Sequence, residues 1–228
     1  LKVCEAPSDL LSHHFKKISG SAMCYAFSVP RGMLCVGMLG QLLSVALTID
    51  SQTTYMVEDD SFGEGVYQVR LKVLKNRATN ERVEVAWNVG GRTEALLLRS
   101  PSGNLREVLL HSKRNTSDVF SNTGWKGDML IPYANRIKNG TYKLNGMTYY
   151  MERNENREPW GREGIHGYLY RKEMHVASAV ANNSCAKLVL SYDFDGTDPG
   201  YPFQLSVALT YILDDKGLTI TTHAENRA

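Results

Sequence analysis

Hydrophobic residues recur at every second position over much of the chain beyond residue 66. The clearest stretch has six such positions in strict alternation: Phe203, Leu205, Val207, Leu209, Tyr211 and Leu213. Shorter stretches repeat the pattern at residues 67–73, 83–89 and 188–194. Successive side chains of a β-strand leave opposite faces of the sheet, so a period of two predicts half-buried strands. No stretch beyond residue 66 sustains the helical period of 3.6.

Turn-forming residues separate these stretches. Asn145-Gly146 lies between two short β-like segments, and this residue pair favours the positive φ angles of a two-residue hairpin turn. Residues 214–217 predict a second hairpin, and residues 195–200 form a longer polar connection. The sequence therefore predicts an all-β protein, an antiparallel β-sandwich, over residues 66–228.

Composition and motifs exclude several classes of function. The 26 basic residues nearly balance the 24 acidic ones, so no basic surface offers nucleic acid an electrostatic attraction. The chain has no G-x-S-x-G nucleophile motif, no phosphate-binding glycine loop with a lysine and no H-E-x-x-H metal motif. We therefore expect no metal site and no nucleic-acid partner.

The first part of the chain differs from the rest. We expect a leader over residues 1–49, containing a signal-peptide-like segment at about 23–48, and a polar lead-in over residues 50–65. Residues 33–47 carry no charge and follow Arg31, as in a secretory signal peptide. This run is too short for a membrane-spanning helix. The sequence predicts a secreted protein with no stable membrane span; a buried core helix, and a cytoplasmic protein, remain the alternatives.

Three sequons agree with an extracellular location. Asn115, Asn139 and Asn182 each begin an Asn-x-Ser/Thr triplet and are predicted glycosylation sites. About two such triplets are expected by chance in a chain with this content of Asn, Ser and Thr. The sequons therefore add little to the evidence from the signal-like segment.

Two loop segments contain the residues best suited to binding a ligand. Arg136 lies in a polar loop before the Asn145-Gly146 hairpin, and its guanidinium offers five fixed donors for hydroxyl or carboxylate groups. His166 is preceded by Gly164-Ile165 and followed by Gly167; glycine allows close backbone approach, and a histidine exchanges hydrogen bonds near neutral pH. Spacing alone leaves open a purely structural role for both, as an ion pair or a capped turn.

These segments resemble the aldose 1-epimerase family. The resemblance rests on Asn135-Arg136-Ile137, the Asn145-Gly146 hairpin and His166-Gly167 about thirty residues after the arginine. It continues through Gly200-Tyr-Pro-Phe203 and the strand pair that ends near Asn226. It runs from about residue 67 to the end of the chain and covers none of residues 1–65.

The resemblance implies the N-terminal portion of a galactose mutarotase-like β-sandwich that is incomplete at its C-terminus. Asn135 and Arg136 match the family's substrate-binding pair for a monosaccharide, a free hexose, and His166 matches the first of two active-site histidines. No cofactor is implied. A second histidine and a catalytic glutamate are expected beyond Asn226 in the family's order. We therefore expect an isomerase in the full-length protein and no activity in residues 1–228 alone.

Two other functions remain open at this point: a carbohydrate-binding sandwich without turnover, and an accessory domain of an unrelated hydrolase or lyase. The sequence also departs from the family's pattern. Met174 stands where an aromatic residue is usual, and residues 154–163 form an unusually charged loop. Both departures bear on the choice of sugar.

Overall fold

The computed structural model describes residues 53–121, 124–155 and 161–227, whose regular secondary structure is almost entirely antiparallel β-strand. The predicted leader (1–49) and its signal-like segment (23–48) lie outside the described residues. Within the described ranges, no helix has the length and hydropathy needed to cross a membrane. The all-β sandwich predicted from alternation is confirmed.

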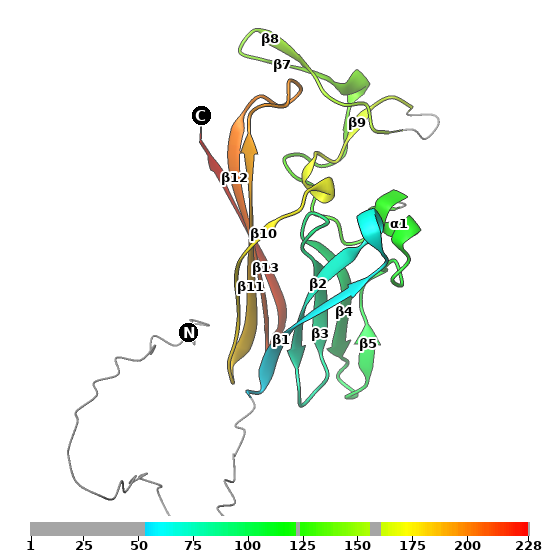
Figure 1. Cartoon of the computed structure of the whole chain (residues 1–228), viewed down its shortest axis with the longest axis vertical. Coiled ribbons are helices and arrows are strands. Elements are labelled where there is room, and N and C mark those ends of the chain that lie inside the picture. Colours follow the sequence, from blue (N-terminus) through cyan, green and yellow to red (C-terminus); the bar gives the residue numbers. More distant parts are fainter. Residues whose placement is uncertain (1–52, 122–123, 156–160, 228) are drawn as a thin grey trace, which may run out of the picture. The chain divides into compact units, whose positions relative to one another are not determined.

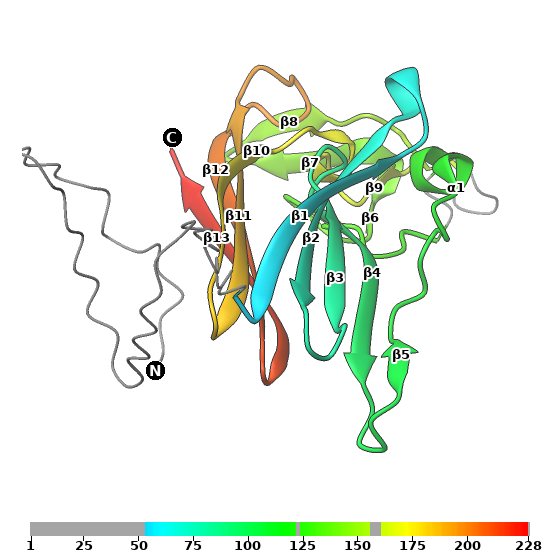
Figure 2. The same cartoon turned by 60° about the horizontal axis from the view of Figure 1, so that its bottom comes forward.

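The first sheet is a five-stranded antiparallel meander (Figure 2). Its strands follow the chain in order: β1 (Tyr55–Phe62), β2 (Val69–Asn76), β3 (Arg82–Ala86), β4 (Arg92–Arg99) and β5 (Leu105–Glu107). A 3₁₀ turn at Gly65–Tyr67 joins the first two strands, and the short helix α1 (Thr116–Ser121) follows the last.

The prediction for residues 50–65 was wrong in one respect, because this polar segment contains strand β1. Its eight residues pair with β2 from Tyr55↔Asn76 to Phe62↔Val69. The acidic run Glu58–Asp60 remains exposed, and Asp59 lies 2.6 Å from the Lys72 ammonium. An edge strand pairs on one side only and can present polar side chains to water, so its composition resembles that of a loop.

The second sheet has four longer strands, β10 (His175–Ala181), β11 (Cys185–Asp195), β12 (Gln204–Asp214) and β13 (Gly217–Asn226). Both predicted features of this region are confirmed. The alternating positions Val207, Leu209, Tyr211 and Leu213 are at most 2% exposed, and Asp214 pairs with Gly217 across a tight hairpin.

The two sheets pack face to face around one hydrophobic core (Figures 1 and 2). The first sheet contributes residues such as Leu74 and Val85, and the second contributes Leu188, Leu190 and Leu209, all fully buried. A smaller cluster covers the other face of the first sheet and includes Leu71 of β2 and Val119 of α1.

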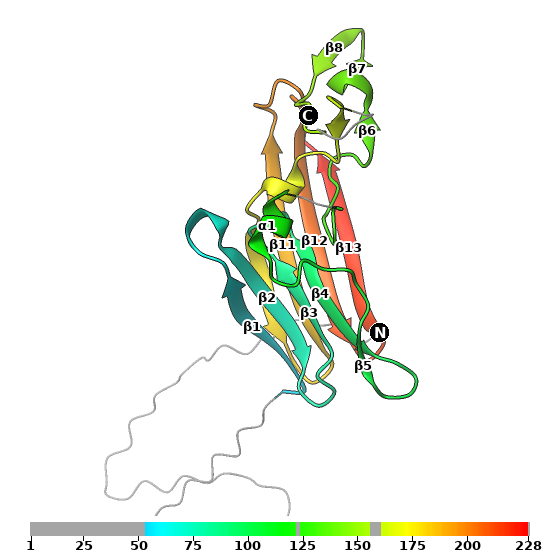
Figure 3. The same ribbon diagram turned by 90° about the vertical axis from the view of Figure 1, so that its right-hand side faces the viewer.

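Two small strand pairs lie together at one end of the second sheet (Figures 1 and 3). In one pair, β6 (Arg136–Ile137) meets β9 (Gly164–Ile165); in the other, β7 (Thr141–Leu144) meets β8 (Met147–Tyr150) across the predicted Asn145-Gly146 turn. A short 3₁₀ turn at Lys138–Gly140 joins β6 to β7, and another at Leu169–Arg171 lies between β9 and β10. These pairs hold both candidate loop segments.

Candidate functional site

The β6–β9 pair brings Asn135 and His166 together although 31 positions separate them. Arg136 faces Ile165 in the register, which places the preceding Asn135 opposite His166. The backbone N–H of Asn135 donates to His166 Nδ1 over 2.9 Å, and the backbone N–H of His166 donates to Asn135 O over 3.1 Å. Two of the three predicted site residues are thus joined by reciprocal hydrogen bonds.

This hydrogen bond fixes the protonation of the His166 ring. A nitrogen that accepts from a backbone N–H carries no proton of its own, so the neutral ring bears its proton on Nε2. The pKa of His166 is lowered, chiefly because burial disfavours the charged ring and secondly because the Arg136 cation is near, while Glu155 acts in the opposite direction. His166 is therefore a neutral hydrogen-bond donor through Nε2–H near pH 7.

Arg136 is held in place by a carboxylate that the sequence interpretation had not singled out. One Nη of Arg136 lies 2.7 Å from Glu155 Oε2, and the other donates to the Asn135 side-chain oxygen over 3.4 Å. Glu155 is only 5% exposed, and its backbone pairs with Glu163 O and with the Arg162 N–H. The unusual charge of residues 154–163 was the sequence feature that pointed to this contact, because Glu155 belongs to that loop and orients Arg136.

Backbone conformation shapes the site as much as side chains do. Asn135 and His166 both have positive φ angles, 64° and 63°, which asparagine and histidine tolerate better than most residues. Gly167 has φ +68°, and a Cβ there would lie 2.2 Å from Ile131 O. The glycine after His166 thus allows contact with the chain's own backbone, and not with a ligand as its position had suggested.

A tryptophan missed by the sequence analysis packs against His166. The Trp125 and His166 ring centroids are 4.5 Å apart with the planes at 71°, and Trp125 also contacts Tyr170 edge-on at 4.7 Å. Trp125 comes forty-one positions before His166, and no local pattern links the two.

A row of aromatic rings continues from this loop to the β7–β8 hairpin. Tyr168 contacts Tyr201 at 6.5 Å, Tyr201 contacts Phe203 at 5.3 Å, and Phe203 contacts Tyr149 at 5.4 Å. Tyr149 stacks on Tyr142, whose hydroxyl donates to Gly200 O. These contacts connect the hairpin to the loop between β11 and β12.

The three sequons differ in how far their asparagines are exposed. Asn115 and Asn139 are exposed, whereas Asn182 is half-buried. The side-chain oxygen of Asn115 accepts from the Asp118 N–H, and that of Asn182 accepts from the N–H groups of Ser184 and Cys185. Glycosylation at all three positions stays a prediction.

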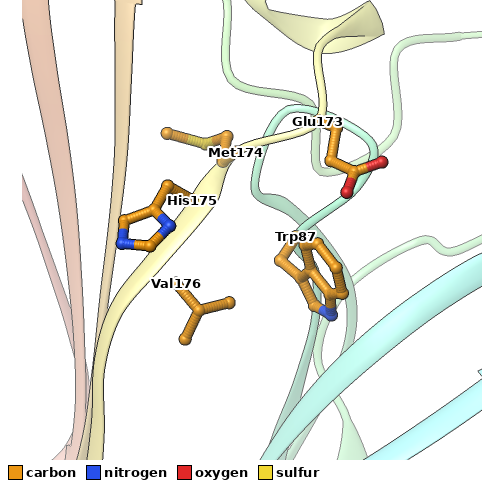
Figure 4. A pocket seen from close by; sticks show the side chains of 5 residues that line it. All are labelled: Trp87, Glu173, Met174, His175 and Val176. Atoms are coloured by element: carbon orange, nitrogen blue, oxygen red, sulfur yellow. The ribbon is translucent and has the colours of Figure 1, made fainter.

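A separate surface hollow of about 470 Å³ lies beside the start of β10 and contains none of the predicted site residues (Figure 4). It is lined by Trp87, Glu173, Met174, His175 and Val176. Glu173 pairs with Arg70 over 3.4 Å, and Arg70 lies over the Trp87 ring. Met174 is 1% exposed and belongs mainly to the inter-sheet core. Met174 therefore departs from the family's pattern at a position that packs in the core.

Across the described ranges, no group of three or more potential metal ligands is present.

A sequence profile described as aldose 1-epimerase matches residues 73–228, more than half of the chain. The chain belongs to the aldose 1-epimerase family. Two curated relatives align at 30% identity: the uncharacterized protein YihR of Escherichia coli strain K12 over 101 residues, and a probable aldose 1-epimerase of Arthroderma benhamiae over 99 residues. The alignments cover 44% and 42% of this chain but only 30% and 22% of those relatives.

Solved structures show the same fold at lower identity. The chain matches galactose 1-epimerase from Lactobacillus acidophilus with a TM-score of 0.55 at 19% identity, covering 75% of this chain and 48% of that one. A galactose mutarotase-like protein from Clostridium acetobutylicum matches with a TM-score of 0.51 at 22% identity, covering 75% and 49%. The chain thus spans about half the length of these structures, and the likeness establishes the galactose mutarotase-like fold.

Proposed function

We propose that the protein interconverts the α and β anomers of a free hexose, with Asn135 and Arg136 binding sugar hydroxyls and His166 donating to a sugar oxygen. In such a reaction a base removes the proton of the anomeric hydroxyl while the ring oxygen gains a proton. The C1–O5 bond breaks, the open aldehyde rotates about C1–C2, and ring closure on the other face gives the other anomer. Because the similar protein from Lactobacillus acidophilus is a galactose 1-epimerase, galactose is the first sugar to test.

The observation that supports this proposal most strongly is the pair of hydrogen bonds between Asn135 and His166, with the Arg136 guanidinium beside them. They give His166 a fixed Nε2–H donor and place a fork of guanidinium donors next to it. A sugar presents several hydroxyls at fixed angles, and preorganised donors of this kind bind them without further loss of side-chain freedom.

The tautomer also limits what His166 can do. Because Nδ1 accepts from the Asn135 N–H, a doubly protonated ring would have to break that bond. His166 therefore supplies a hydrogen bond to the substrate and not a whole proton. We assign full proton transfer to the second histidine and the carboxylate base that the family resemblance places beyond Asn226. Turnover is accordingly proposed for a protein that carries them, and sugar binding alone for residues 1–228.

Polarimetry on freshly dissolved α-D-galactose and α-D-glucose tests the proposal. A protein that extends through the second histidine and the glutamate should accelerate mutarotation, and residues 1–228 should not. Arg136→Lys keeps the charge beside Glu155 but loses the planar fork, so we expect about a tenfold or greater loss of kcat/KM. Arg106→Ala, at an exposed position on β5, is the matched control and should keep full activity. No acceleration by the longer protein would remove the epimerase function for these sugars.

A sugar-binding protein without turnover is the second candidate. It would show saturable hexose binding that Arg136→Lys weakens, and no acceleration of mutarotation by any length of the protein. The same two measurements, binding and polarimetry, therefore separate it from the enzyme.

We also propose that the protein is secreted and glycosylated, on the strength of the signal-like segment and the exposed sequons Asn115 and Asn139. Expression in a secretory host followed by enzymatic removal of N-glycans should lower the mass. An unchanged mass in the culture medium would contradict glycosylation, and retention inside the cell would favour the cytoplasmic alternative.

A further inference from the structure

A buried charged network lies beneath the loop that carries Trp125. The side chains of Arg92, Glu94 and Asp128 are 1%, 1% and 0% exposed. Arg92 Nε donates to Glu94 Oε2 over 3.1 Å, and its Nη1 donates to Asp128 Oδ1 over 3.3 Å. Ser112 Oγ donates to the other oxygen of Glu94. One guanidinium therefore faces two buried carboxylates.

Burying the ionised Asp128 carboxylate in this arrangement costs free energy. Its second oxygen, Oδ2, is buried and lacks a hydrogen-bond partner among the residues that the structure describes. Burial raises the pKa of Asp128 to about 6, although the Arg92 cation acts to lower it. A buried carboxylate with one oxygen unsatisfied contributes little net stability, so its presence points to another role.

Asp128 ends a tight turn that lies directly on β4. The Thr93 N–H donates to Gly127 O over 2.9 Å, and the Asp128 N–H donates to Trp125 O over 3.4 Å. Gly127 has φ +71°, and a Cβ there would lie 2.0 Å from Thr93 O, so only glycine fits. The ion pair between Arg92 and Asp128 thus holds a turn with little room to move.

The same turn includes Trp125, which has φ 53° and contacts two rings. Its ring centroid lies 4.5 Å from that of His166 and 4.7 Å from that of Tyr170, which is 1% exposed and hydrogen-bonded to Asn154. Tyr170 is therefore a fixed support, and the Trp125 ring limits where the imidazole can lie.

We propose that Arg92 and Asp128 are positioning residues, which hold the 125–128 turn so that Trp125 fixes the His166 ring with Nε2–H available to the sugar. The inference rests on the proposed function in so far as His166 acts on a sugar. The chain of contacts itself, from Arg92 through Asp128 and Trp125 to His166, requires no ligand and is tested without one.

The test follows the ring nitrogens of His166 by NMR as the pH is varied, in the wild-type chain and in Asp128→Asn. If Asp128 acted only through its charge, removing that charge would lower the His166 pKa further, because a nearby anion favours the imidazolium. If Asp128 positions Trp125, its loss lets water reach the ring. The pKa should then rise toward the ordinary value of 6.5, and the ring should become a mixture of the two tautomers.

Asp59→Asn is the matched control, because it makes the same substitution in an exposed ion pair with Lys72 and should leave His166 unchanged. Trp125→Phe leaves the charged network intact and decides the question if Asp128→Asn does not fold; it should raise the His166 pKa in the same direction. An unchanged or lowered pKa with the Nε2–H tautomer kept would overturn the proposal. A hexose titration that fails while these shifts occur would count against the proposed function alone.

Discussion

The core between the two sheets and the loop layer around His166 are built on different principles. In the core, alternating apolar side chains such as Leu188, Leu190 and Leu209 are fully buried. In the loop layer, the chain turns through positive φ angles at Trp125, Asn135, Asn139 and His166, and polar bonds hold the turns.

This difference implies that one region determines the stability of the fold and the other determines the geometry of the candidate site. Hydrophobic burial is not directional and tolerates small shifts, so the core determines whether the chain folds. Hydrogen bonds and ion pairs are directional, so the loop layer determines where Asn135, Arg136 and His166 point. Substitutions in the two regions should accordingly give different combinations of lost stability and lost geometry.

The largest effect on stability is expected in the core. Leu190→Ala should lower the free energy of unfolding by about 2–5 kcal/mol, because it removes buried methyl groups and leaves a cavity. Urea denaturation measures the loss. Leu144→Ala, at a position 44% exposed in β7, is the control and should cost far less. A similar cost for both would mean that the core does not carry the stability assigned to it.

A medium, pH-dependent effect is expected from Asp128. Its pKa is raised to about 6 in the folded protein, so the folded state holds a proton there that the unfolded state has already released. The contribution of Asp128 to stability is therefore greatest at low pH and falls as the pH rises between its ordinary value of 3.8 and about 6.

The measurement is the difference in unfolding free energy between wild type and Asp128→Asn, which removes the contributions of other groups. This difference should fall by about 1–3 kcal/mol between about pH 4 and pH 7. A difference that rises with pH would show that Asp128 acts as an ordinary stabilising ion-pair partner of Arg92.

The smallest effect is expected at the tip of the β7–β8 hairpin. Gly146 has φ +78° and open space where a Cβ would lie, so Gly146→Ala meets only backbone strain. We expect a loss of about 1 kcal/mol in thermal or urea unfolding. The His166 signals should not change. A shift in those signals would show that the hairpin takes part in placing the site.

The sequence predicts the strands of the second sheet well because a single physical pattern, burial on one face, determines them. It fails at β1, where an edge strand with an exposed acidic run resembles a loop. The family resemblance predicts Asn135, Arg136 and His166 as site residues, and the structure places the three next to one another.

The supporting residues could not be predicted in the same way. Glu155 pairs with Arg136, which lies 19 positions earlier in the chain. Trp125 contacts His166 only because the fold brings them together, and no local sequence pattern links the two. The three-dimensional path of the loops determines which residues become such partners. The hydrophobic periodicity that reveals the strands carries no information about that path.

The most direct test of the site is a hexose titration of residues 1–228 observed at the His166 ring nitrogens. We expect a saturable shift of Nε2 with D-galactose or D-glucose, a constant Nδ1 that keeps its bond to Asn135, and much weaker binding in Arg136→Lys. Saturable binding that leaves Nε2 unshifted, or that is equally strong in Arg136→Lys, would contradict a sugar site built from Asn135, Arg136 and His166.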